Sequence, residues 1–150
     1  MTTATGRSDS VPAEVVVLQR WLAAEHAVAY AYGVAGARLD GTDRRRATRG
    51  WTGHRTSRDR LTALVEARSG TPAGPAAAYA LPVPVDGPAA ARRLLVLVEE
   101  RLAAVCADAV ADLTQALRTA AADGLSSAAV SAARWRGRGE TFPGLPERAS

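Results

Sequence analysis

The chain has 150 residues, of which 47% are apolar and 23% are charged, a composition that fits one globular domain and excludes an intrinsically disordered protein. All 19 basic residues are arginines, yet the formal net charge is only +4. The high isoelectric point therefore reflects the guanidinium group rather than a strong positive field, and nucleic acid is not expected as a partner. A single cysteine, Cys106, excludes an internal disulfide and a cysteine-rich zinc site.

The start of the chain carries no targeting signal that we recognise. Residues 1–10 are small and polar, so we predict a disordered N-terminal tail there. They lack the charged region followed by an apolar run that marks a secretory signal. No uncharged apolar stretch reaches the ~20 residues that a membrane-spanning helix needs. We therefore expect a soluble, cytoplasmic protein with no membrane partner.

The first half of the chain predicts two long helices. The first begins near Ser10, with Pro12 in its first turn, and runs to about Arg38. The second starts after Thr42, with Asp43 in its first turn, and stops at Ser69-Gly70. Because the link between them is so short, these two helices must lie antiparallel.

Residues 70–86 contain four prolines and cannot be helical throughout. We predict a long Pro-rich crossover between the second and third helices, held against the bundle by its apolar side chains. Those side chains are Tyr79, Leu81, Val83 and Val85.

The rest of the chain predicts two more helices and a tail. Asp112-Leu-Thr-Gln115 matches a capping box, which divides the sequence into a third helix of about 88–111 and a fourth of about 115–137. This division places Gly124 inside the fourth helix, where it costs about 1 kcal/mol relative to alanine and permits close helix packing. The sequence thus predicts an all-α four-helix bundle over residues 11–140, followed by a C-terminal tail over 141–150.

Three of the predicted helices bring polar side chains to their inward stripes. A period of 3.6 residues places Glu25 and Tyr32 on the first, His54 and Arg58 on the second, and Glu99 on the third. Buried carboxylates need a charged partner or a metal. One alternative is a single iron, manganese or zinc ion bound by Glu25, His54 and Glu99. The other is a metal-free cluster in which Arg58 neutralises a carboxylate and His54 completes the hydrogen bonds.

Four strings of residues carry a resemblance to a known family: Trp21-Leu-x-x-Glu25-His26, His54-Arg55-x-x-Arg58-Asp59, Tyr79-x-Leu81-Pro82 and Ala132-Ala133-Arg134-Trp135. They resemble the actinobacterial domain of unknown function 4439, which is classed as ferritin-like, over about residues 12–145. The resemblance implies a ferritin-like antiparallel four-helix bundle and does not imply a reaction.

The ferritin-like class also implies a set of metal ligands that can be compared with the residues of this chain. Its di-iron proteins use one Glu from each of two helices and a Glu-x-x-His from each of the other two. Glu25 and Glu99 match the single glutamates, but Trp51 stands three residues before His54, where the motif has Glu. The fourth predicted helix has no Glu-x-x-His. We therefore expect a degenerate di-iron site that binds no metal or other cofactor.

These observations favour a non-enzymatic structural or interaction protein, with a homodimer formed through an Ala-rich helix face. The alternative is a single-metal-binding or redox protein that uses Glu25, His54 and Glu99. A third hypothesis is an RNA- or ribosome-associated module that uses the arginine run at 44–49, made of Arg44, Arg45, Arg46 and Arg49. This run lacks the interleaved aromatic residues typical of such surfaces.

Overall fold

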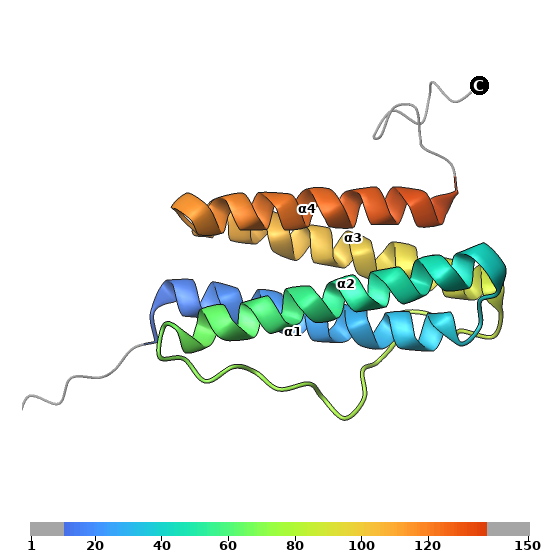
Figure 1. The fold of residues 1–150 in the computed structure, drawn as a ribbon, viewed down its shortest axis with the longest axis horizontal. Coiled ribbons are helices and arrows are strands. Elements are labelled where there is room, and N and C mark those ends of the chain that lie inside the picture. The colour runs from blue at the N-terminus through green and yellow to red at the C-terminus, as the bar shows by residue number, and fades with distance from the viewer. Residues whose placement is uncertain (1–10, 138–150) are drawn as a thin grey trace, which may run out of the picture.

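The computed structural model describes residues 11–137, which form four α-helices and no strand (Figure 1). The helices are α1 (Ala13–Gly36), α2 (Gly41–Glu66), α3 (Pro88–Asp112) and α4 (Gln115–Arg136). The prediction of an all-α chain is confirmed for this part of the sequence. The predicted tails at 1–10 and 141–150, and residues 138–140 of the predicted bundle, lie outside the described residues.

The order of packing leaves one side of the molecule open. Helix α1 packs against both α2 and α3, and α3 packs against α4. In the described part of the chain, no Cα atom of α2 comes within 8 Å of one in α4. Figure 1 shows that the chain reverses direction from α1 to α2 and again from α3 to α4. Between these two pairs, residues 67–87 run back along the length of the helices, so that α3 follows the same direction as α2.

The break between the third and fourth helices is confirmed, but the capping box that predicted it is not formed. Asp112 is the last residue of α3 rather than the cap of the next helix. Thr114 precedes α4 with extended backbone, and its side chain makes no capping hydrogen bond. Leu113 is only 1% exposed, so the turn is fixed by burial of an apolar side chain.

Residues 67–87 contain neither helix nor strand and are held against α1. The side chain of Gln19 donates to the carbonyl of Thr71 and accepts from the backbone N–H of Ala73. Nε2 of His26 lies 3.0 Å from the carbonyl oxygen of Ala73. Further along, three of the apolar residues that predicted this packing are partly buried against the core: Leu81, Val83 and Val85.

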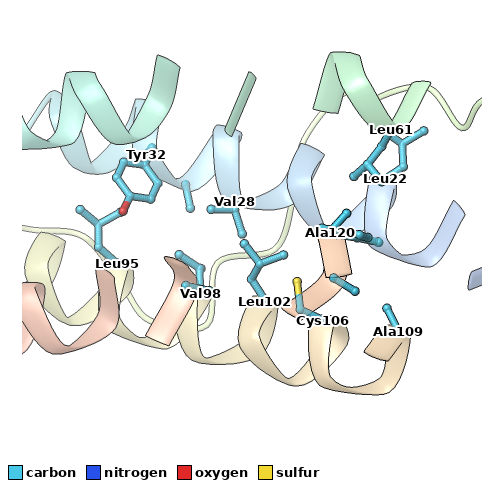
Figure 2. Close-up of a cluster of buried hydrophobic side chains, with 14 of the residues drawn as sticks. Leu22, Val28, Tyr32, Leu61, Leu95, Val98, Leu102, Cys106, Ala109 and Ala120 are labelled. Carbon is cyan, nitrogen blue, oxygen red and sulfur yellow. The ribbon is translucent and has the colours of Figure 1, made fainter. Parts of the chain in front are cut away.

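The core between the helices consists mainly of leucine, valine and alanine side chains. Figure 2 shows Leu22 of α1 beside Leu61 of α2, and Leu102 beside Cys106 on α3. Gly124 of α4 is required for close packing, as the sequence predicted. A Cβ atom there would lie 2.8 Å from Cζ2 of Trp21 and 3.1 Å from Sγ of Cys106. Among the described helices, none has both the length and the apolar composition needed to cross a bilayer.

The thiol of Cys106 is expected to be unreactive in the folded protein. Its side chain is fully buried, and this burial, together with the negative charges of Glu25 and Glu99, raises the pKa of the thiol to about 12. Because the thiolate is the reactive form, an aromatic disulfide reagent at about pH 8 should label Cys106 only after denaturation. Labelling of the native protein as fast as the denatured protein would contradict this burial.

Candidate functional site

A connected set of polar side chains crosses the centre of the molecule. Glu99 on α3 is fully buried, and Glu25 on α1 is only 3% exposed. Both occupy positions on long apolar stripes, so the packing of the neighbouring leucines carries them inward. Each carboxylate therefore depends on protein groups to replace the water that it has lost.

The imidazole of His54, on α2, bridges these two carboxylates. Its Nδ1 lies 2.8 Å from Oε2 of Glu25, and its Nε2 lies 3.1 Å from Oε1 of Glu99. A neutral imidazole carries one N–H, so it donates both hydrogen bonds only when protonated. Burial by itself lowers the pKa of His54, but hydrogen bonds to the two glutamates and their charges outweigh this effect and raise the pKa to about 9. His54 is therefore a cation between two acidic side chains at neutral pH.

Further donors complete the environment of Glu25. Its Oε1 accepts hydrogen bonds from the indole N–H of Trp21 at 3.2 Å and from the hydroxyl of Ser57 at 2.9 Å. Trp21 lies one helical turn before Glu25, and Ser57 lies one turn after His54. Neither donor was predicted from the sequence, although their spacing of one helical turn from Glu25 and His54 was a usable signal.

Glu99 is joined to the fourth helix through Tyr32. The hydroxyl of Tyr32 donates to Oε1 of Glu99 at 2.5 Å and accepts from the indole N–H of Trp135 at 2.9 Å. Burial, followed by the charge of Glu99, raises the pKa of Tyr32 far above its ordinary value, so the phenol remains protonated and acts as a donor. The other oxygen of Glu99, Oε2, has no hydrogen-bond partner among residues 11–137.

The structure brings Glu25, Tyr32, His54 and Glu99 together and leaves out Arg58. The guanidinium of Arg58 donates to the neighbouring carboxylate of Asp59, through Nε at 2.9 Å and through Nη2 at 2.8 Å. The expected pairing of Arg58 with Glu25 or Glu99 is therefore not formed. Arg58 is four residues after His54, so its side chain leaves the helix about 40° away from the direction of His54 and closer to solvent. There its flexible guanidinium pairs with Asp59.

Trp51 does not face the site. Its place three residues before His54, where the di-iron motif has an inward-facing Glu, predicts an inward side chain, but Trp51 is 38% exposed, with the guanidinium of Arg55 4.4 Å above its ring. Gly50 faces inward in its place and contacts Tyr32. The inward face of α2 is thus rotated by one residue from the predicted stripe at this point.

The cluster does not have the geometry that a metal ion needs. Among the residues that the structure describes, no three His, Cys, Asp or Glu side chains are arranged to hold one ion. Metal–ligand distances are about 2.0–2.2 Å for imidazole nitrogen and carboxylate oxygen, and all ligands must converge on one point. Glu25 and Glu99 instead lie at different nitrogens of the His54 ring. These residues do not fit a metal centre in this arrangement.

A cleft opens beside this cluster, on the side where α2 and α4 are apart. Its volume is about 350 Å³, and Trp21, Glu25 and His54 contribute to its lining. The facing surfaces of α2 and α4 are rich in small residues, which leaves the space unfilled. These are Gly50, Gly53 and Ser57 on α2, and Gly124, Ala128 and Ser131 on α4.

The raised pKa of His54 predicts a pH dependence of stability. A group whose folded-state pKa is raised contributes stability that is complete below its unfolded pKa, near 6.5, and is lost as the pH rises through about 9. The free energy of unfolding should fall by on the order of 2–3 kcal/mol across this interval. Urea titrations of the wild type and of His54→Gln at both ends of the interval measure the effect. An identical pH dependence in the two proteins would contradict the assignment.

Residues 11–137 define an all-α fold of four helices with a buried charged cluster at its centre. The chain belongs to the family described as a domain of unknown function, DUF4439, whose model matches residues 17–147. It is also similar to the crystal structure of a conserved hypothetical protein from Mycobacterium tuberculosis. The identity is 32%, the match covers 86% of this chain and 98% of that one, and the TM-score is 0.81. No curated protein matches the chain.

Proposed function

We propose that this protein is a non-enzymatic, ferritin-like antiparallel bundle in which the His54 imidazolium takes the place of a metal ion. The observation that carries the proposal is the contact of both ring nitrogens with carboxylates, one from Glu25 and one from Glu99. In ferritin-like metalloproteins, glutamates and histidines from the four helices surround the ions. Here a cation already lies between the two glutamates.

The fourth helix supports the same proposal. Where a di-iron protein has a Glu-x-x-His, α4 provides the indole of Trp135, which donates to the hydroxyl of Tyr32. An indole N–H is a donor only and is not a metal ligand. The polar groups of the centre thus link all four helices by hydrogen bonds, and we assign the cluster a structural role, fixing the register of a bundle that acts through binding.

Metal analysis tests this proposal against the single-metal or redox alternative. Protein purified without a histidine tag should contain well below one equivalent of iron, manganese or zinc. Addition of these ions should leave the thermal midpoint unchanged, whereas a ligand at 100 times its Kd would add about 2.7 kcal/mol of stability. Stoichiometric metal in the wild type that is lost from Glu25→Gln would overturn the proposal.

A second experiment measures the protonation state of the His54 ring directly. Nitrogen-15 NMR of histidine-labelled protein distinguishes an imidazolium from either neutral tautomer. At pH 7 we expect the ring of His54 to carry a proton on both nitrogens, because its pKa is raised to about 9. His54→Gln identifies the signal by its absence. A spectrum with one bare ring nitrogen on His54 at pH 7 would contradict the proposal.

A further inference from the structure

The cleft beside Glu25 continues into a second hollow at the other end of the gap between α2 and α4. This hollow has a volume of about 460 Å³ and is lined by Arg46, Arg49 and Arg134, together with the rings of Tyr32 and Trp135. Gly50 and Ser131 line both spaces. The two spaces therefore adjoin and form one groove. Three arginines line one end, and the other end is lined by charged and polar residues of both signs: Glu25, His54, Ser57, Arg60 and Asp123.

The charge at the arginine end is not neutralised within the described residues. There, neither Arg49 nor Arg134 forms an ion pair, and Arg46 is paired with Asp43 only at 3.6 Å. By contrast, Arg68 and Arg92 each form a direct hydrogen bond to a carboxylate. Three guanidinium groups at one hollow repel each other, and a bound oxyanion relieves that repulsion with two-pronged hydrogen bonds.

One of these arginines is already oriented toward the hollow. The guanidinium of Arg46 lies 5.3 Å from the centre of the Trp135 ring and donates to the backbone carbonyl of Arg134 at 3.4 Å. These contacts restrict the side chain before any ligand arrives. Less conformational entropy is therefore lost when the arginine binds an anion.

We propose that the groove between α2 and α4 binds a small organic oxyanion, with its phosphate or carboxylate group at Arg46, Arg49 and Arg134. The rest of the ligand extends along the groove toward His54, past Gly53 and the small side chain of Ser131. Arg46 and His54 are eight residues apart on one helix, or about 12 Å along its axis. This span matches a metabolite-sized molecule rather than a polymer, and the proposal does not depend on whether the cluster binds metal.

Calorimetric titration with phenyl phosphate tests the anion specificity, with phenol as the uncharged analogue. We expect saturable binding of phenyl phosphate, no binding of phenol, and NMR shift changes at the backbone amides of Gly50 and Ser131. The double variant Arg49→Gln/Arg134→Gln should lose affinity at least tenfold. No saturable binding by the wild type would overturn the proposal.

A matched control separates a specific site from an effect of net charge. Arg20→Gln/Arg101→Gln removes the same two charges from exposed positions on α1 and α3 that do not line the groove. We expect its affinity for phenyl phosphate to stay within about twofold of the wild type, because exposed charges distant from the groove are screened by salt. An equal loss of affinity in the two double variants would overturn the proposal.

A second variant locates the body of the ligand. Gly53 lines the groove and a Cβ atom there would meet nothing within 4 Å, so Gly53→Leu adds a bulky side chain to the groove wall with open space at its first atom. Phenyl phosphate should bind at least tenfold more weakly to this variant, while inorganic phosphate binding should change less than threefold. Gly33→Leu, which is equally open but lies on α1, should affect neither ligand. Unchanged binding of phenyl phosphate to Gly53→Leu would overturn the placement in the groove.

Discussion

Replacing His54 with alanine is expected to lower the free energy of unfolding by about 3–5 kcal/mol at pH 7, as the removal of one partner from a buried ion pair does. The imidazolium is the cation between Glu25 and Glu99, and it donates a hydrogen bond to each. Without it, the two buried carboxylates repel each other and lose these donors. Urea unfolding followed by circular dichroism measures the loss.

A second substitution distinguishes charge from packing as the cause. Glu99→Gln in the His54→Ala background removes one of the two uncompensated charges, so we expect it to restore part of the lost stability. The same change in the wild-type background should be destabilising, because it weakens the contact with the imidazolium. If the loss in free energy of unfolding in the double variant equals the sum of the losses in the two single variants, His54 acts as a packed side chain only.

The second large effect is expected at Gly50, where alanine should destabilise the protein by about 2 kcal/mol. A Cβ atom at this position would lie 2.2 Å from Cε1 and 2.8 Å from Cζ of Tyr32. The ring cannot move aside freely, because its hydroxyl is held by Glu99 and Trp135. This overpacking exceeds the helix propensity that alanine gains over glycine, about 1 kcal/mol.

Gly53 is the matched control for Gly50 on the same helix. No atom lies within 4 Å of a Cβ built at Gly53, so alanine there gains helix propensity without a clash. Gly53→Ala should therefore stabilise the protein by about 0.5–1 kcal/mol. The two variants, three residues apart, should shift the urea midpoint in opposite directions. A shift of the same sign in both would contradict the close approach of Tyr32 to α2.

The sequence was most informative where the helices are rich in apolar residues. On α1 and α3, closely spaced leucines, valines and alanines define the buried face, so the inward positions of Glu25, Tyr32 and Glu99 could be predicted from periodicity alone. The break between α3 and α4 was also found, although its cause is the burial of Leu113 and not a capping box.

Helix α2 shows why the rest could not be predicted. Only Ala47, Leu61 and Val65 are buried on it, too few to fix its rotation to within one residue. A shift of one residue turns a side chain by about 100°, which is the difference between Trp51 and Gly50 facing Tyr32. The role of His54 also depends on the distance between carboxylates of two other helices. That distance is a property of the packed helices, and no sequence spacing encodes it.

The central hydrogen bonds connect parts of the chain that are far apart in the sequence. They join residues that are 29, 45, 67 and 103 positions apart in the sequence. Each helix forms from local contacts, but these bonds form only after loops of such lengths have closed. The cluster is therefore complete only when all four helices are in place and Trp135 reaches Tyr32. No partly folded form that lacks α4 retains the complete cluster, so its assembly links the last helix to the stability of the first.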